Sequence, residues 1–179
     1  KSKLIARTNE ALCTEQKYIC VSRPRRFGKS MAANMLAAYY DRSEHTDELF
    51  ENLKISKDQS YRENLNRYDV IKINIQEFLS MTGTVEEMLE MLKNYLISDF
   101  KEAYPKILLR DEKNLIQVMK DVFSYTKCPF VILIDEWDCL FREYKQDKEE
   151  QKKYLDFLRA WLKDKDYVAL AYITGILPI

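Results

Sequence analysis

A glycine–lysine–serine triplet stands between an apolar run and a helical pattern near the start of this chain. Tyr18–Ser22 reads as a short apolar strand, a basic loop follows it, and Lys29–Tyr40 is rich in Ala, Met and Leu at helical spacing. A strand that enters a helix through a loop ending in Gly28, Lys29 and Ser30 is typical of proteins that cradle phosphate groups. This segment therefore predicts a parallel α/β sheet with a phosphate-binding loop at the carboxyl end of one strand.

The loop offers several ligands to a nucleoside triphosphate. Backbone N–H groups and the helix N-terminus face the anion, the Lys29 amine reaches the β- and γ-phosphates, and the Ser30 hydroxyl holds Mg²⁺. The residues expected to bind the nucleotide are Arg25, Arg26, Phe27, Gly28, Lys29, Ser30 and Met31. As an alternative, Gly28 or Ser30 simply caps a helix. The pattern G-x-x-x-x-G-K-[ST] is also incomplete, because Arg23 stands where its first glycine belongs.

A near-continuous apolar run, Phe130–Ile134, leads directly into Asp135 and Glu136. Such a run is typical of a strand buried on both faces of a parallel sheet. In P-loop ATPases an Asp at the tip of this strand orients Mg²⁺ near the loop serine, and a Glu after it can accept a proton from the attacking water. As an alternative, the two carboxylates cap the next helix or face solvent. The two motifs together favour ATP binding, with Ser30 and Asp135 at the metal and with Lys29 and Glu136 as catalytic residues.

Thr174 ends the last predicted strand, directly before Gly175. In ATPases that carry a Glu beside the Asp, this strand usually lies between the other two, and its terminal polar residue can sense the γ-phosphate or the lytic water. We therefore predict Thr174 as a third catalytic residue; the alternative is a threonine that only caps a turn. Trp137 and Asp138 are expected to shape the start of the next helix and to carry no chemistry.

Strands and helices alternate along the chain, which predicts a P-loop NTPase fold of three layers, with helices on both faces of a mainly parallel sheet. The predicted strands are Tyr18–Ser22, Val70–Ile75, Phe130–Ile134 and Tyr167–Thr174. The predicted helices are Ser2–Cys13, Lys29–Tyr40, Thr84–Tyr104, Asn114–Tyr125 and Lys148–Lys163. The expected strand order is 2-3-4-1. A fifth strand is expected beyond the C-terminus, flanking the loop strand, and without it the sheet has an exposed edge.

Local patterns add detail to three of these helices. Thr84 and Glu87 form the capping box that opens one of them. The helix after the loop is expected to bury Met31, Met35, Leu36 and Tyr39 on one face. The last helix is expected to direct Leu155, Leu158 and Trp161 inward.

Composition places the chain among ordinary globular proteins and excludes some partners. The 179 residues are 46% hydrophobic and 32% charged, which suits a single domain with a sizeable core. Basic and acidic residues both number 29, so the net charge does not favour nucleic acid or an anionic membrane. No apolar stretch is long enough to span a bilayer and the N-terminus has no signal-peptide pattern, so we expect a cytoplasmic protein without a membrane partner.

The four cysteines show no C-x-x-C spacing. Cys20 and Cys128 lie inside or beside apolar strand patterns, which favours buried, reduced thiols over a zinc site or disulfides. The chain begins without Met and ends on an apolar run, and we expect residues 1–179 to be one domain cut from a longer protein at both ends.

Four basic residues lie within seven positions of the loop: Arg23, Arg25, Arg26 and Lys29. Such a cluster can be a localisation signal or a nucleic-acid patch. A loop between a strand and a helix is a poor place for a signal that a receptor must read. One of the arginines can instead contact a phosphate or a carboxylate through two hydrogen bonds. The sequence does not distinguish which of the three arginines does so.

Three strings of residues resemble the AAA-ATPase-like family of bacterial proteins. They are Ser22-Arg-Pro-Arg-Arg-Phe-Gly-Lys-Ser30, Leu133-Ile-Asp-Glu-Trp-Asp138 and Tyr172-Ile-Thr-Gly-Ile-Leu-Pro-Ile179, and Lys1–Ile5 resembles the family's lead-in. The resemblance implies that Arg23 is the usual residue at its position, whereas Trp137 stands where the family more often has Tyr. It also implies a C-terminal domain similar to PD-(D/E)XK nucleases in the longer protein, so nucleic acid is an indirect partner at most.

These observations predict an ATP-binding and ATP-hydrolysing domain with ATP and Mg²⁺ as its ligands. The nucleotide cycle would drive a conformational change in a larger bacterial protein. The alternative function is a nucleotide-binding switch or scaffold with little or no hydrolysis, because the sequence contains no identifiable arginine finger. A nucleic-acid-binding module that uses the arginine loop is a third interpretation. A small-molecule kinase is disfavoured, because neither a lid nor an acceptor site is recognisable.

Overall fold

The computed structural model describes residues 3–24, 26 and 28–177. Within it the chain separates into two compact units. The sheet unit contains Lys1–Asn74, Pro129–Asp138 and Val168–Ile179. The helical unit contains Ile75–Cys128 and Cys139–Tyr167.

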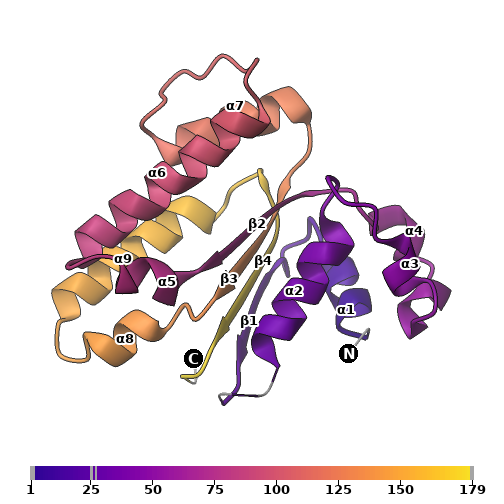
Figure 1. The fold of residues 1–179 in the computed structure, drawn as a ribbon, viewed down its shortest axis with the longest axis horizontal. Coiled ribbons are helices and arrows are strands. Elements are labelled where there is room, and N and C mark those ends of the chain that lie inside the picture. The colour runs from indigo at the N-terminus through magenta and orange to yellow at the C-terminus, as the bar shows by residue number, and fades with distance from the viewer. Residues whose placement is uncertain (1–2, 25, 27, 178–179) are drawn as a thin grey trace. The chain divides into compact units, whose positions relative to one another are not determined.

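Four parallel strands form the sheet of the sheet unit (Figure 1). They are β1 (Tyr18–Ser22), β2 (Asp69–Asn74), β3 (Phe130–Asp135) and β4 (Val168–Gly175). Their order is β1-β4-β3-β2, which confirms the predicted order 2-3-4-1. Because all four strands are parallel, their carboxyl ends meet at one edge of the sheet, and the predicted site residues follow these ends.

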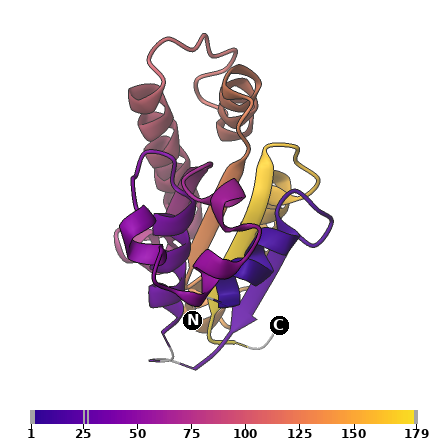
Figure 2. The same ribbon diagram turned by 90° about the vertical axis from the view of Figure 1, so that its right-hand side faces the viewer.

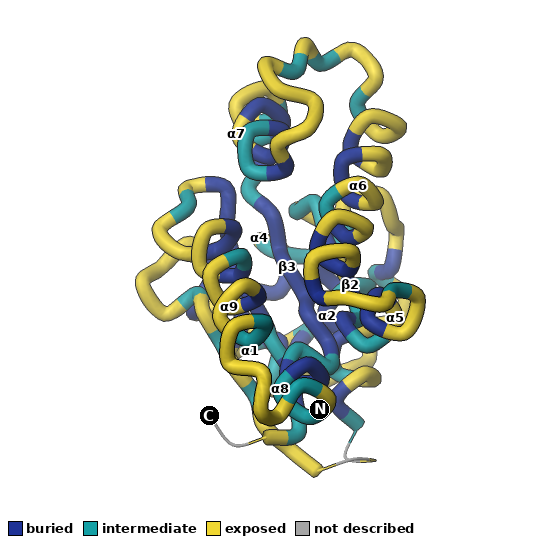
Figure 3. Tube along the Cα trace, turned by 90° about the vertical axis from the view of Figure 1, so that its left-hand side faces the viewer, coloured by how far each residue is buried: buried dark blue, intermediate teal, exposed yellow. Residues whose placement is uncertain are grey.

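The strands differ in burial as their place in the sheet requires. All six residues of β3 are buried, so this strand is covered on both faces, as its continuous apolar run predicts (Figure 3). Within the described strands β1 pairs with β4 alone, and its residues alternate between exposed and half-buried. Cys20 on β1 is accordingly exposed, which contradicts the predicted burial of its thiol, whereas Cys128 is buried as predicted. All four cysteines are free thiols.

Two helices of the sheet unit cover one face of the sheet (Figures 1 and 2). They are α1 (Lys3–Ala11) and α2 (Lys29–Tyr40), and the bounds of α2 are those predicted. Their buried residues form one hydrophobic cluster with residues of β3 and β4. On α2 the residues Leu36 and Tyr39 are buried as predicted, but Met31 is 61% exposed. The prediction for Met31 was wrong because the buried stripe passes through Ala33 instead.

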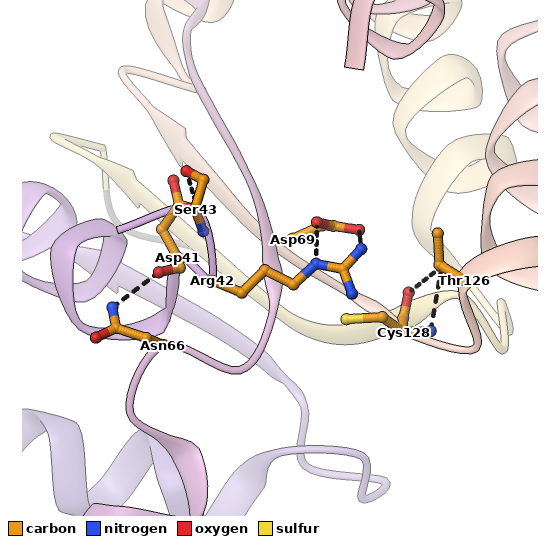
Figure 4. Close-up of polar contacts among 7 residues, drawn as sticks. All are labelled: Asp41, Arg42, Ser43, Asn66, Asp69, Thr126 and Cys128. Atoms are coloured by element: carbon orange, nitrogen blue, oxygen red, sulfur yellow. Dashed lines mark hydrogen bonds and ion pairs between the residues drawn. The ribbon is translucent and has the colours of Figure 1, made fainter. Parts of the chain in front are cut away.

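The connection from α2 to β2 contains three short helices. They are α3 (Asp47–Phe50), η1 (Lys54–Lys57) and α4 (Tyr61–Asn64). Polar contacts tie its two ends together, as Figure 4 shows: Arg42 donates two hydrogen bonds to the Asp69 carboxylate, at 2.7 and 2.9 Å. Asn66, in the left-handed region with φ 53°, donates to the carbonyl of Asp41 at 2.8 Å. These contacts position the start of β2 next to the end of α2.

The helical unit consists of five helices within the described residues. They are α5 (Ile75–Ser80), α6 (Val85–Ala103), α7 (Leu115–Thr126), α8 (Cys139–Glu143) and α9 (Lys148–Leu162). Thr84 caps α6 as predicted and accepts a hydrogen bond from the Glu87 N–H, while the Glu87 carboxylate accepts from the Gly83 N–H rather than from Thr84 itself. No helix in the described part of the chain combines the length and the apolar composition that crossing a membrane requires.

Two predicted details of the helical unit were wrong. Ile75 was expected to end the second strand, but it begins α5, because a run of apolar residues does not by itself mark where a strand gives way to a helix. On α9 the residues Leu158 and Trp161 are buried as predicted, whereas Leu155 is 39% exposed.

Candidate functional site

Glycine at position 28 is required by the backbone conformation at the start of α2. Gly28 has φ 73° and ψ 28°, in the left-handed region that a residue with a Cβ adopts only at a cost. Its carbonyl accepts the first helical hydrogen bond, from the Ala32 N–H at 3.0 Å, and no side chain caps the helix. Gly28 is thus the N-cap residue of α2, as the alternative states, whereas the Ser30 hydroxyl donates to Asp135. A helix N-terminus of this kind is a general binding site for anions.

The Lys29 side chain is folded back onto its own loop. It is 8% exposed, and its Nζ donates to the carbonyls of Arg23 at 2.9 Å and Pro24 at 3.0 Å. Two backbone carbonyls are neutral partners, so the ammonium charge is solvated by the loop without being neutralised. A phosphate oxygen is a stronger partner for this ammonium than a neutral carbonyl.

Asp135 joins two of the predicted site residues from different elements of the sheet unit. This carboxylate is 5% exposed at the carboxyl end of β3. Its Oδ2 accepts from the Ser30 hydroxyl at 2.5 Å and its Oδ1 accepts from the Thr174 hydroxyl at 2.5 Å. The Glu136 N–H also donates to Oδ1, at 3.0 Å. The structure thus brings together the ends of β3 and β4 and the start of α2, although the three residues are far apart in the sequence.

The oxygen ligands at this point suit a hard cation. A carboxylate and a hydroxyl in contact are ligands of the type that Mg²⁺ takes, and Mg²⁺ is usually held by one or two protein oxygens together with phosphate. Within the described residues there is no group of three or more His, Cys, Asp or Glu side chains that could hold a metal ion. The residues Ser30 and Asp135 therefore fit a magnesium ion that arrives with a nucleotide and do not form a complete metal site of their own.

Glu136 follows Asp135 with its backbone in an unusual conformation. Its φ is 53°, in the left-handed region, and its side chain is half-buried. A non-glycine residue in this region costs free energy, and such residues concentrate at functional sites. The next residue, Trp137, donates its N–H to the carbonyl of Thr174 at 3.1 Å and so ties the tip of β3 to the tip of β4.

Asp138 has a role that the sequence interpretation missed. It was expected to shape the start of a helix, yet its Oδ2 accepts from the N–H groups of Ile176 at 2.8 Å and Leu177 at 2.6 Å. Asp138 is completely buried. The spacing Asp135-x-x-Asp138 was visible in the sequence, but its partners are about 40 residues away and no local pattern identifies them. Asp138 also directly precedes α8, so its role at the start of that helix stays a prediction.

The chain leaves no room for a side chain at Gly175. A Cβ added there would lie 2.7 Å from Nε1 of Trp137 and 2.8 Å from Cγ of Asp138. The Gly175 carbonyl accepts from the Arg23 N–H at 3.1 Å, and the Ser22 hydroxyl donates to the Ile176 carbonyl at 3.0 Å. The tip of β4 is therefore hydrogen-bonded on one side to the tip of β3 and on the other to the start of the loop.

The remaining predicted residues contribute unequally. Arg26 is exposed with φ 67°, and Met31 on α2 is 61% exposed. Arg25 and Phe27 lie outside the described residues. Below Thr174 on the same strand, burial raises the pKa of Tyr172, and the charge of Arg23 opposes that rise in part.

Comparison with known proteins places the chain in a family. No curated protein matches the sequence. A family model described as "Predicted AAA-ATPase" matches residues 1–179. This match agrees with the parallel sheet order and with the loop, the Asp135 carboxylate and the Thr174 hydroxyl at its carboxyl edge. The chain belongs to the AAA-ATPase-like family.

Proposed function

We propose that this protein binds ATP with Mg²⁺ and hydrolyses it. The observation that carries the proposal is the Asp135 carboxylate, buried at the end of β3 and hydrogen-bonded to the hydroxyls of Ser30 and Thr174. A P-loop ATPase needs its loop serine and its strand-end aspartate next to each other, so that both can act on one magnesium ion. If Ser30 and Asp135 only capped separate helices, they would not need to contact each other.

The proposed roles follow from position and chemistry. The N–H groups at the start of α2 and the Lys29 amine bind the β- and γ-phosphates, with Gly28 permitting the close approach of the backbone. Ser30 and Asp135 hold Mg²⁺, which on binding neutralises charge on the phosphates. Glu136 accepts the proton of the attacking water.

Two further parts of the proposal concern less direct roles. The Thr174 hydroxyl, which already contacts Asp135, responds to the γ-phosphate at the tip of β4. Arg25, Arg26, Phe27 and Met31 belong to the same nucleotide-binding loop in this proposal. The whole is one ATPase domain of three-layer P-loop type, with a fifth strand beside β1, and its nucleotide state drives a conformational change in a larger cytoplasmic protein.

A nucleotide-binding switch is the second candidate, and the position of Lys29 favours it. The amine is bonded to two carbonyls of its own loop, so contact with phosphate requires these bonds to break. A protein whose main task is to change between two loop conformations needs a step of this kind and needs no fast hydrolysis.

Two variants and one control test the proposal. Lys29→Ala removes the amine and is expected to weaken ATP binding at least about tenfold, measured by calorimetric titration in the presence of Mg²⁺. Glu136→Gln is expected to retain ATP binding and to lower turnover by a factor of about 10² to 10⁴, measured by phosphate release. Lys152→Ala, at an exposed lysine of α9, should leave both quantities unchanged. ATP binding that is equally tight before and after Lys29→Ala would refute the proposed site, whereas turnover equally slow before and after Glu136→Gln would leave only the switch.

A further inference from the structure

A cavity of about 270 Å³ opens beside Gly28 and Lys29 in the sheet unit. Its walls come from four elements: α1 contributes Leu4, β1 contributes Val21, α2 contributes Met35 and β4 contributes Tyr172. Gly28, Ala32 and Met35 follow each other at intervals of four and three residues, so they share one stripe of α2 and lead from the loop into the cavity. The cavity is therefore continuous with the proposed phosphate site.

The Tyr172 hydroxyl gives this cavity a polar group that can bind a ligand. Tyr172 is 3% exposed, and its side chain lines the cavity. Its hydroxyl makes no hydrogen bond to any other residue that the structure describes. The hydroxyl oxygen is not one of the enclosed side-chain atoms that lack a partner, so it meets the open space of the cavity, where water or a ligand can bond to it. Since burial raises the pKa of Tyr172, the phenol is neutral at pH 7 and its hydroxyl can donate a hydrogen bond to a ligand atom.

The charges around the cavity restrict the kind of ligand. Arg7 of α1 and Arg23 of the loop line it and are exposed to solvent, and none of the described lining residues carries a carboxylate. A guanidinium group stacks on aromatic rings and binds anions, so two arginines over an apolar floor suit an aromatic ring attached to a negatively charged group. A cationic ligand is disfavoured by the same charges.

We infer that this cavity receives the base and the ribose of the nucleotide whose phosphates bind at Gly28 and Lys29, with the Tyr172 hydroxyl as a hydrogen-bond donor to the nucleoside. The inference rests on the proposed function and adds the part of the site that contacts the nucleoside. The volume is compatible with it: about 270 Å³ is slightly less than the about 300–1,000 Å³ of pockets that hold drug-sized molecules. Such a space is too small for a folded peptide.

Two ligands separate the nucleoside part of the site from the phosphate part. ATP contains both parts, whereas inorganic triphosphate lacks the base and the ribose. We would measure the Kd of each with Mg²⁺ by calorimetric titration for the wild type, Lys29→Ala, Tyr172→Phe and Met35→Trp. Asn34→Trp is the matched control for the tryptophan, because Asn34 is exposed on the same helix and does not line the cavity.

The expected result is a selective loss. Met35→Trp fills the cavity and should weaken ATP at least about tenfold, and Tyr172→Phe should weaken it about two- to tenfold, the value of one hydrogen bond. Neither variant should change the Kd of triphosphate, whereas Lys29→Ala should weaken both ligands. Asn34→Trp should behave as the wild type. If Met35→Trp does not fold, two other variants test the nucleoside site. One is Tyr172→Phe. The other is Arg7→Glu, a change at an exposed position that should also weaken ATP binding and leave triphosphate binding unchanged.

Three outcomes would overturn the inference. If ATP binding depends on Lys29 but is equally tight in the cavity variants, the proposed function stands and the cavity does not bind the nucleoside. If the cavity variants weaken triphosphate binding as much as ATP binding, the cavity is part of the phosphate site. If neither ligand binds the wild type, the proposed function fails and the inference fails with it.

Discussion

Removing the Asp138 carboxylate should destabilise the folded chain substantially, although no sequence motif marks this residue as structural. Asp138 is completely buried, and its Oδ2 accepts hydrogen bonds from two successive backbone N–H groups, those of Ile176 and Leu177. In Asp138→Ala both N–H groups lose their acceptor and the tip of β4 loses two of the hydrogen bonds that attach it to the segment after β3. The variant should therefore lower the free energy of unfolding and loosen the strand end that carries Thr174.

The magnitude follows from two opposing contributions. A hydrogen bond to a charged group contributes about 1.5–3 kcal/mol, and the lower value applies here because Ile176 is half-buried and Leu177 is exposed, so water can replace the carboxylate. Two such bonds amount to about 3 kcal/mol. Removing a buried charge returns part of its desolvation cost, so we expect a net loss of about 2–3 kcal/mol for Asp138→Ala. Asp138→Asn keeps an acceptor oxygen at neutral strength, and we expect it to lose about 1–2 kcal/mol.

Urea denaturation followed by tryptophan fluorescence measures these differences. The control is Asp156→Ala, because Asp156 is exposed and its ion pair with Arg159 lies at 3.4 Å on the surface of α9. Such a pair contributes about 0–1 kcal/mol, so this variant should remain close to the wild type. We expect the wild type to be the most stable, Asp138→Asn to be less stable and Asp138→Ala to be the least stable. An Ala variant as stable as the wild type would refute the reasoning, because the desolvation cost of the carboxylate would then equal the value of its two bonds.

Two further predictions concern sterics and pH. Gly175→Ala should lower the free energy of unfolding by about 1–3 kcal/mol in the same urea assay, because its Cβ would lie 2.7 Å from the Trp137 indole; Gly83→Ala, where the nearest atom is a flexible carboxylate oxygen at 3.4 Å, should cost less than about 1 kcal/mol. Burial raises the pKa of Tyr39 to about 12 from its ordinary value near 10, so its contribution to stability is complete below pH 10 and is lost as the pH rises toward 12. Between these values the free energy of unfolding should fall by about 1.4 kcal/mol per pH unit from this group, and Tyr39→Phe should make the fall shallower by that amount. An unchanged slope in the phenylalanine variant would show that the tyrosine ionises equally in both states.

The sequence predicts those parts of the fold that depend on local patterns. β1 and α2 have the predicted bounds because an apolar run, a glycine in the left-handed region and a helical repeat follow each other directly. The helix cap at Thr84 is likewise local, since its side chain accepts from the N–H of Glu87, three residues later. The strand order was predictable from two motifs. In P-loop ATPases with a Glu beside the Asp, the strand before the phosphate loop and the strand that ends in Asp-Glu are separated by a third strand.

Contacts between distant segments account for what the sequence did not predict. The burial of Asp138 and its bonds to two N–H groups depend on how β3 and β4 end relative to each other, and no spacing in the sequence encodes that geometry. The same holds for the cavity beside Lys29, because its walls belong to α1, β1, α2 and β4. Exposure within a helix was also misjudged at Met31 and Leu155, since an apolar residue beside the buried stripe can remain at the surface.

The geometry around Arg23 explains why the loop can do without its first glycine. Glycine is favoured where the backbone takes a positive φ, and it is required where a side chain has no room. Arg23 is not among the residues with positive φ, and its side chain is exposed, so neither requirement applies at this position. Its backbone is fully used instead: the N–H donates to the Gly175 carbonyl and the carbonyl accepts from the Lys29 amine. Any residue could make these two bonds, whereas the guanidinium adds a positive charge at the cavity that Tyr172 lines. Arg23→Gly should therefore preserve the fold of the loop and weaken ATP more than inorganic triphosphate, in the same titrations that test the cavity.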